Sequence, residues 1–314
     1  MNDQKFSTPV VFIIFNRPQV TSRVFAQIAK IKPSKLLVIS DGPRKNIFGE
    51  EQKVLEVRAI INKVDWDCEV YTNFSDVNLG CKYRVSSGLD WVFSLVEEAI
   101  ILEDDCLPNL SFFIFCQEML DRYRGDKSIG MIGGINFQPP HVRTTADYYF
   151  SKYTHIWGWA TWADRWVGNY DVDMRNWPKV RADKALKNTL SSVKELKYWY
   201  TIFDRVHSNQ IDTWDYQWVF ANWTANRFNI LPSVNLISNI GFGDDATHTK
   251  GYSELANLPV EDLAFPLRHP NKIKVNIAAD QYTDRLCYRH PPFYKRLIGK
   301  FGQFINITKL GFMK

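Results

Sequence analysis

The sequence predicts an α/β fold of the Rossmann-like type, with a mainly parallel sheet flanked by helices. Strand-like and helix-like segments alternate through the first half of the chain, a rhythm that favours parallel strands joined by crossover helices. Several short apolar runs also end abruptly in polar residues. The clearest is the run at 99–102, which Glu103, Asp104 and Asp105 follow directly. The carboxyl ends of parallel strands share one edge, where open sheets bind their ligands.

The elements expected in the first half follow from apolar periodicity and turn residues. The continuous apolar run at 10–15 is typical of a buried strand, and Pro18 and Pro33 bracket a helix at 20–31. Four further apolar runs predict strands, and three periodic segments between them predict helices. The strands are 35–40, which ends in an Asp-Gly-Pro turn, 68–72, 99–102 and 129–135. The helices are 50–63, 83–96, which follows an Asn-Leu-Gly turn, and 109–123, which opens after Pro108.

The second half is less regular. We expect a strand at 148–153, a long helix at 184–206, a helix at 216–226 and an extended segment at 230–240. No linker rich in Gly, Pro or Ser divides the chain. We therefore expect one domain over 1–284, with a nucleotide-binding half at 1–135 and an acceptor half at 136–284, followed by an appendage at 285–314.

Composition and cysteine content narrow the class of protein. Apolar residues make up 45% and charged residues 23% of 314 residues, enough for a sizeable core. Five scattered cysteines without metal or redox spacing favour a reduced, cytoplasmic protein, and the first residues lack the apolar core of a signal peptide. Nine of the eleven tryptophans lie between 157 and 223. That concentration indicates either a binding surface for flat ligands or an aromatic core.

The end of the chain is basic. After Asp284 there is no acid and the net charge is +7, which leaves −2 for the rest. Phe293, Leu297, Phe301 and Phe304 recur at helical spacing among the cations. This pattern favours an anionic membrane surface as partner, at the inner face of the membrane, and not nucleic acid. Packing of the segment on the core is the alternative.

Polar residues follow several expected strands and could converge on one crevice. Cations suit phosphates, and carboxylates suit ribose hydroxyls, a base edge or a metal. Each residue also has a structural alternative: a surface cation, a turn former, a solvated helix face or a solvated acidic turn. The set consists of Asn16, Arg17, Asp41, Lys82, Arg84, Glu103, Asp104 and Asp105.

Two nucleotide-binding classes are disfavoured. The chain has no Gly-x-Gly-x-x-Gly and no Walker loop, so a dinucleotide oxidoreductase or a P-loop enzyme is not expected. The remaining interpretation is a nucleotide held through Mn²⁺ or Mg²⁺ at the carboxylate cluster.

Three motifs carry a resemblance to a known family. They are Asn-Arg-Pro at 16–18, Ser-Asp-Gly at 40–42 and Glu-Asp-Asp-Cys-Leu-Pro at 103–108, the last followed by Phe-Phe at 112–113. The chain resembles glycosyltransferases of the GT-A type that use nucleotide sugars, and within them the glycan-processing N-acetylglucosaminyltransferases. The resemblance is continuous over about 8–135 and patchy beyond, at 155–159, 214–215 and 241–243.

The resemblance implies roles for individual residues. Arg17 and Asp41 would contact the nucleotide base and its surroundings, and Lys82 stands where the relatives often have His. Glu103 would bind the donor sugar. Asp104 would bind ribose or a metal-bound water, and Asp105 would ligate Mn²⁺ or Mg²⁺ together with the diphosphate.

Further roles fall in the second half. The segment ending in Trp157, Gly158 and Trp159 would face donor sugar and acceptor, with core packing as the alternative. An inverting reaction needs a general base. Asp215 is the first choice and Asp212 the rival, because the relatives carry an acidic pair before a Trp where this chain has Asp-Tyr-Gln-Trp. N-capping is the alternative role for Asp215. His248 is a further metal ligand, or a surface histidine.

The sequence therefore predicts a metal-dependent inverting glycosyltransferase. It would move a sugar from a nucleoside-diphosphate donor, most simply a UDP-sugar, to a glycan or glycolipid acceptor. A nucleotidyltransferase that forms sugar nucleotides is one alternative, although it would need a Gly-rich loop near the N-terminus. The other is a non-catalytic protein that binds glycans or membranes.

Overall fold

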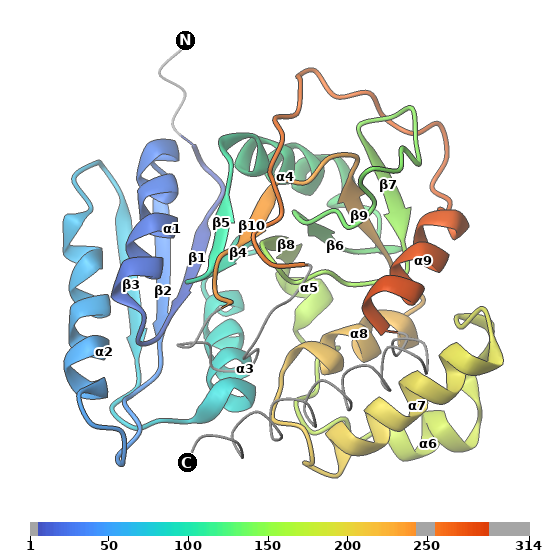
Figure 1. Cartoon of the computed structure of the whole chain (residues 1–314), viewed down its shortest axis with the longest axis horizontal. Coiled ribbons are helices and arrows are strands. Elements are labelled where there is room, and N and C mark those ends of the chain that lie inside the picture. The colour runs from blue at the N-terminus through green and yellow to red at the C-terminus, as the bar shows by residue number, and fades with distance from the viewer. Residues whose placement is uncertain (1–5, 243–254, 289–314) are drawn as a thin grey trace, which may run out of the picture.

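The structure is a computed structural model that describes residues 6–242 and 255–288. It contains an eight-stranded sheet in the order β3-β2-β1-β4-β8-β6-β9-β7 and a two-stranded sheet of β10 and β5 (Figure 1). The strands are β1 (Val10–Ile14), β2 (Lys35–Ser40), β3 (Glu69–Phe74), β4 (Glu98–Glu103), β5 (Cys106–Pro108), β6 (Ile129–Gly133), β7 (Tyr148–Ser151), β8 (Trp159–Trp162), β9 (Phe228–Pro232) and β10 (Ile237–Asn239). The α-helices are α1 (Pro18–Ile31), α2 (Glu50–Ala59), α3 (Gly80–Phe93), α4 (Leu110–Tyr123), α5 (Ala163–Trp166), α6 (Trp177–Ala182), α7 (Val193–His207), α8 (Asp215–Thr224) and α9 (Ile277–Thr283).

The predicted fold class is confirmed. Strands β3, β2, β1 and β4 pair in parallel, and β6 pairs with β9 in parallel. Strand β8 lies antiparallel between β4 and β6, and β7 closes the far edge antiparallel to β9. The sheet is therefore mixed but mostly parallel. The β1, β2 and β4 strands end at one edge, and their carboxyl-terminal residues lie beside one another.

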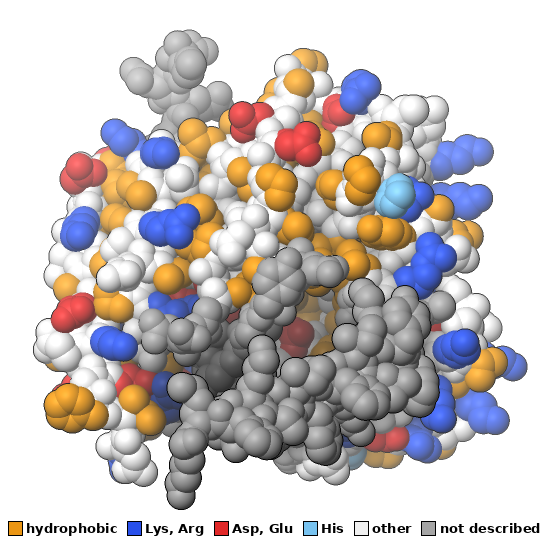
Figure 2. Space-filling view, in the orientation of Figure 1, with side chains coloured by type: hydrophobic (Ala, Val, Ile, Leu, Met, Phe, Trp, Pro, Cys, Tyr) orange, Lys and Arg blue, Asp and Glu red, His pale blue; other side chains and the backbone are white. Residues whose placement is uncertain are grey.

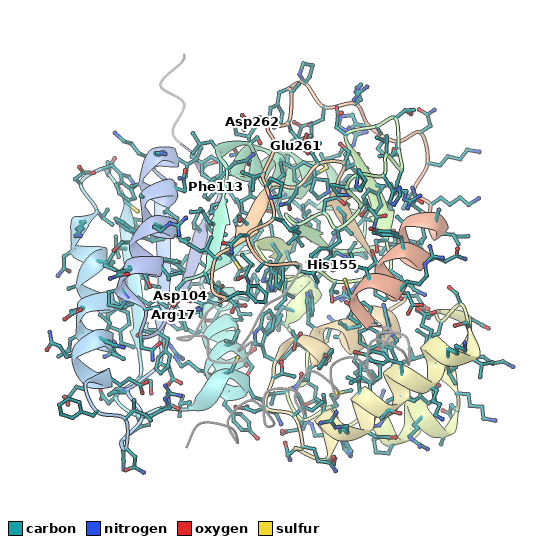
Figure 3. The ribbon with its side chains drawn as sticks, in the orientation of Figure 1. Arg17, Asp104, Phe113, His155, Glu261 and Asp262 are labelled. Atoms are coloured by element: carbon teal, nitrogen blue, oxygen red, sulfur yellow. The ribbon has the colours of Figure 1, made fainter. Side chains whose placement is uncertain are left out.

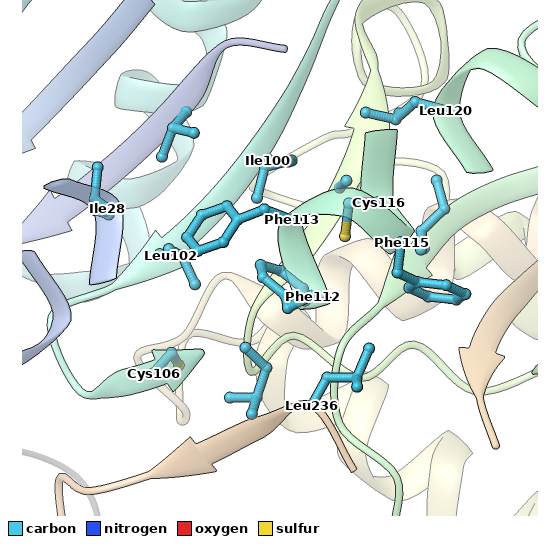
Figure 4. Packing of buried hydrophobic residues seen from close by; sticks show 14 of the residues in the cluster. Ile28, Ile100, Leu102, Cys106, Phe112, Phe113, Phe115, Cys116, Leu120 and Leu236 are labelled. Atoms are coloured by element: carbon cyan, nitrogen blue, oxygen red, sulfur yellow. The ribbon is translucent and has the colours of Figure 1, made fainter. Parts of the chain in front are cut away.

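Two apolar layers cover the sheet. On one face, side chains of β1, β2 and β4 pack against α1 and α4, with Ile28, Phe112 and Phe113 at the contact (Figure 4). On the other face, the alternate residues of the same strands pack against α3, α5 and α8. This alternation follows from the two-residue period of a strand whose two faces are both buried. Helix α4 begins where the Asn109 side chain accepts a hydrogen bond from the Phe112 amide, at 3.1 Å.

The tryptophan-rich half is mainly core. Eight of the nine tryptophans between 157 and 223 are fully buried, and only Trp157 is partly exposed. Trp162 joins the layer under α1 and α4, four others join the layer under α8, and three join a third apolar cluster between α6, α7 and α8. The aromatic-core interpretation is therefore right for eight of these positions. Burial of large flat side chains, and not ligand stacking, explains the local excess of Trp.

The structure differs from the expectation in two places. The long helix expected at 184–206 is broken into a 3-10 turn, η2 (Ala185–Asn188), and the helix α7. Ser192 caps the N-terminus of α7, because its side chain accepts a hydrogen bond from the Glu195 amide at 3.2 Å. The capping serine starts a new helix because it satisfies a free amide there. Strand β8 was not expected: only its first residue lies in the segment 155–159, which was expected to face the donor sugar and acceptor, and no element was expected over 160–162. Within the described ranges, no helix combines the length and apolarity needed to cross a bilayer. The segment at 289–314, with its expected amphipathic pattern, lies outside the described residues.

Candidate functional site

A cleft opens at the carboxyl-terminal edge of β1, β2 and β4. Its cavity volume is about 330 Å³, within the range of small-molecule sites. The loops after these strands, the start of α3 and the segments at 156–157 and 239–242 form its wall. Its charged lining residues are Arg17, Arg44, Arg84, Asp41, Glu103, Asp104, Asp105 and Asp212.

Arg17 joins the end of β1 to the acids that follow β4. Its Nε donates to Asp104 Oδ2 at 3.3 Å, and its Nη2 donates both to Asp104 Oδ1 and, at 3.0 Å, to Asp105 Oδ2. Figure 3 shows Arg17 and Asp104 side by side. The Arg17 side chain is only 15% exposed. One shielded guanidinium thus bridges two neighbouring carboxylates and offsets only one of their two charges.

Glu103 is left without such a partner. Its Oε1 atom is buried and accepts no hydrogen bond among the described residues, although the side chain lines the cleft. Burial raises the pKa of Glu103 well above its usual value, and the nearby carboxylates of Asp105 and Asp104 raise it further. Burial also raises the pKa of Asp104 to about 6, although Arg17 opposes the shift. The deep end of the cleft is therefore rich in carboxylates and poor in compensating charge.

The same atoms bear on the predicted metal. Among the residues that the structure describes, no group of three His, Cys, Asp or Glu side chains is placed to hold a metal ion. Two carboxylates do converge on a single positive nitrogen, Arg17 Nη2. Carboxylate oxygens are the donors that Mg²⁺ and Mn²⁺ prefer. Asp104 and Asp105 therefore fit one cation between them, provided that other ligands come from a bound substrate or water. His248 lies outside the described residues.

Asp41 holds the turn before α3. Its carboxylate accepts from the amides of Leu79 at 2.9 Å and Gly80 at 3.1 Å, and from the Asn78 side chain at 3.0 Å. It also accepts from the Gly42 amide at 2.9 Å. These bonds satisfy amides at the start of a helix that its own N-cap residue leaves free. They also use most of the acceptor capacity of the Asp41 carboxylate.

Arg84 lines the cleft but directs its donors to the backbone. Its Nε donates to the carbonyl of Ser40 at 3.1 Å, and its Nη2 donates to the side chain of Asn73 at 2.7 Å. Lys82 is buried and does not line the cleft. Its Nζ donates to Asn209 Oδ1 at 2.7 Å, and so it ties α3 to the loop after α7. The structural alternative of a solvated helix face is wrong for both residues, because both are buried.

A buried acid that the sequence analysis overlooked supports the loop after β2. Glu50, at the start of α2, accepts from Asn16 Nδ2 at 2.8 Å and from the Arg44 amide at 2.7 Å, and it pairs with the Arg44 guanidinium. Asn16 is thereby directed to Glu50 and does not line the cleft, whereas Arg44 does. The signal available in the sequence was the position of Arg44 directly after the Asp-Gly-Pro turn that ends β2.

The segment at 155–159 contributes less surface than expected. Trp157 lines the cleft beside Phe242, with ring centroids 5.7 Å apart. Trp159 is fully buried in β8 and stacks on Trp214, so the expectation that it faces a sugar is wrong. Gly158 has φ +65°, and a Cβ there would lie 2.5 Å from Ile237; it allows close backbone packing. Burial lowers the pKa of His155, labelled in Figure 3, to about 3, which keeps it neutral.

The two predicted bases differ in position. Asp212 is exposed and lines the cleft, and its Oδ1 accepts from the Lys82 amide at 3.4 Å. Asp215 is the first residue of α8 and is not among the residues that line the cleft. Its carboxylate accepts from the Thr213 hydroxyl.

Comparison with known proteins shows only distant likeness. No family model matches the chain, and no curated protein matches it. Among solved structures, UDP-glucose pyrophosphorylase in complex with UDP-glucose is 6% identical, with a TM-score of 0.34, over 72% of this chain and 90% of that one. A 4-diphosphocytidyl-2C-methyl-D-erythritol synthase from Anaerococcus prevotii is 13% identical, with a TM-score of 0.31, over 72% of this chain and 100% of that one. The bifunctional glycosyltransferase WbbM is 10% identical, with a TM-score of 0.32, over 71% of this chain and 38% of that one. Likeness at this level carries no functional argument.

Proposed function

We propose that the protein is a metal-dependent inverting glycosyltransferase of the GT-A type, which transfers a sugar from a nucleoside-diphosphate sugar to a glycan or glycolipid acceptor. The observation that carries the proposal is the convergence of Arg17 with Glu103, Asp104 and Asp105 in one cleft at the carboxyl-terminal edge of the sheet. The resemblance of the Glu-Asp-Asp segment to N-acetylglucosaminyltransferases supports it.

The charge of the cleft supports a cation requirement. Three arginines and five carboxylates line it, so its formal net charge is −2 when all are ionised. A diphosphate would be repelled by such a surface. A divalent cation held by Asp104 and Asp105 would neutralise this negative charge, and when bound it would stabilise charge on the leaving diphosphate. Arg17 and Arg44 would supply the remaining positive charge around the phosphates.

Other residues would shape the donor site. Because its carboxylate is already occupied by the turn before α3, Asp41 would position that turn and not contact the base directly. Phe15, which lies 5.6 Å from the Arg44 guanidinium, would offer an apolar face at the same end. Glu103, with one unpartnered oxygen, would accept from a sugar hydroxyl.

The general base would be whichever of the two candidate aspartates, Asp212 or Asp215, lines the cleft. An acceptor hydroxyl must lose its proton as it attacks the sugar from the side opposite the diphosphate. We propose Asp212 for this role over Asp215, because Asp212 is exposed and lines the cleft. Trp157, also in the wall, would then pack against the sugar or the acceptor.

One experiment separates this function from its alternatives. The purified chain is incubated with a panel of nucleoside-diphosphate sugars and Mn²⁺, and the released nucleotide is identified. A glycosyltransferase releases the nucleoside diphosphate, and Asp105→Asn should abolish release. The matched control is Asp121→Asn, because Asp121 is an exposed acid on α4. Nucleoside triphosphate formed only with added pyrophosphate would indicate a nucleotidyltransferase, and metal-independent binding without turnover would indicate a non-catalytic protein.

A further inference from the structure

In the region of α7 and α9, acidic side chains are buried and basic side chains are exposed. Its acids lie inside: Glu195, Asp280 and Asp284 are all buried. Glu195 pairs with Lys152 Nζ at 2.6 Å, and Asp280 accepts from the Ser151 hydroxyl at 2.6 Å. These acids are occupied within the fold, so they do little to neutralise cations on the outside.

The outer side of this region carries lysines. Lys184 directly precedes the turn η2 and Lys187 lies within it, and Lys194 and Lys197 share one side of α7 because they are three residues apart. All four are exposed, and none has an ion pair among the described residues. The only exposed acid between 180 and 200 is Asp183. Figure 2 shows Lys and Arg side chains gathered along the right-hand edge of the molecule, where α7 and α9 lie in Figure 1.

An open cavity of about 430 Å³ continues this surface onto α9. Arg143 and Arg285 line it, with the Arg143 guanidinium 5.3 Å from the ring of Tyr282. Arg285 also borders Ser192, the N-cap of α7, in a smaller neighbouring cavity. Arg285, in the segment that directly follows α9, therefore lies next to the N-terminus of α7. We define the α7 surface as Lys184, Lys187, Lys194, Lys197, Arg143 and Arg285.

The described chain ends against the same helix. Tyr288 packs on Trp199 of α7, with ring centroids 4.8 Å apart. The sequence that follows, 289–314, contains six Lys or Arg residues, no acid and eleven residues of Phe, Tyr, Leu, Ile or Met. The described chain thus ends beside α7, against its buried face, and the sequence that follows is basic and apolar. Val193, between the two lysine pairs, is 83% exposed and adds an apolar side chain to it.

We propose that the α7 surface docks on an anionic lipid bilayer. Lysines spread over a surface attract a sheet of negative headgroups through long-range electrostatics, and they keep their charge in water while apolar neighbours approach the lipid. The cavity lined by Arg143, Arg285 and Tyr282 accommodates a single anionic headgroup. The proposal does not depend on the enzymatic one, because binding to lipid requires neither a sugar nucleotide nor a metal.

Sedimentation with lipid vesicles tests the proposal on the full chain. Vesicles of phosphatidylcholine alone are compared with vesicles in which part of it is replaced by phosphatidylglycerol, at low and high salt. The variant carries Lys184→Glu, Lys187→Glu, Lys194→Glu and Lys197→Glu. The control carries four reversals on the opposite side of the sheet, at the exposed lysines Lys30, Lys32, Lys53 and Lys63, and so has the same net charge. Circular dichroism verifies that both remain folded.

We expect the wild type to bind only the anionic vesicles and to be released by salt. The variant should lose at least tenfold in affinity, whereas the control should lose less than threefold. Equal losses in the two variants would show that net charge alone drives binding and would overturn the proposal. An unaffected variant, or a wild type that binds heparin or nucleic acid but not anionic vesicles, would overturn it as well.

Discussion

Arg17 and a divalent cation should compete for the same two carboxylates. In the structure the guanidinium lies where a cation shared by Asp104 and Asp105 would lie. The side chains of Arg17, Asp104 and Asp105 are 15%, 6% and 17% exposed. The energetic cost of breaking a buried ion pair therefore applies, and the remaining exposure places it at the lower end of the range. Removing one partner of such a pair costs about 3 kcal/mol. Arg17→Met should therefore lower the free energy of unfolding by about 3 kcal/mol, or Tm by about 5 °C for a chain of this length.

The same substitution should improve metal binding in the absence of nucleotide. In the wild type a metal ion must first displace the Arg17 guanidinium. If this displacement costs about 3 kcal/mol, the apparent affinity of the protein for the ion is weakened by about a hundredfold. With Met at position 17 that cost disappears. Mn²⁺ alone should then raise the Tm of the variant, since a ligand that binds only the folded state stabilises it, and should change the wild type much less. Titration followed by electron paramagnetic resonance measures the affinity directly.

A second arginine provides the control. Arg58 is half-buried near the same edge, but its guanidinium donates to Ser40 and to backbone carbonyls, not to a carboxylate. Arg58→Met should destabilise the protein without any gain in Mn²⁺ affinity. Equal Mn²⁺ affinities for the wild type and Arg17→Met would refute the reasoning, because the guanidinium and the ion would then not share a position.

Two further predictions rest on single buried carboxyls. Glu103→Gln should stabilise the protein by about 1 kcal/mol, measured by urea unfolding, because it removes a carboxyl whose charged form burial and neighbouring acids disfavour. It should also abolish turnover of the sugar nucleotide. An unchanged or lower stability would contradict this account. Asp280→Asn should alter the pH dependence of stability. Burial raises the pKa of Asp280 to about 6 from 3.8, so the unfolded chain ionises first, and the stability present below pH 4 is lost as the pH rises to about 6. Relative to the wild type, the variant should gain about 3 kcal/mol across that window; a constant difference would show that Asp280 titrates normally.

Much of the fold could be predicted because its signals are local. The apolar runs that form β1, β2 and β4 are each bounded by turn residues, and β2 was predicted with its observed bounds. Strand β8 was missed because four residues between a glycine and a short helix carry no periodicity of their own. Its identity as a strand comes from pairing with β4 and β6, contacts that are remote in sequence.

The site was predictable to the level of segments but not of atoms. The sequence places Arg17 and the acids of 103–105 at strand ends, and the structure brings Arg17 within hydrogen-bond distance of Asp104 and Asp105. The sequence does not reveal that the Asp41 carboxylate accepts hydrogen bonds from the amides of Leu79 and Gly80. That outcome depends on where the start of α3 lies in three dimensions. The functional reading of a polar residue at a strand end therefore requires knowledge of the amides around it.

Glu103 distinguishes a ligand site from a structural acidic cluster. Asp41, Glu50 and Asp280 are also buried acids, and each accepts hydrogen bonds from the surrounding fold. Glu103 has an oxygen that the described protein leaves unsatisfied, and it lies beside two carboxylates that already share one arginine. An acid in such a position destabilises the fold and supports no neighbouring turn or helix end through that oxygen. Its presence is explained if a bound ligand supplies the missing donor, which is what the hydroxyls of a sugar would do.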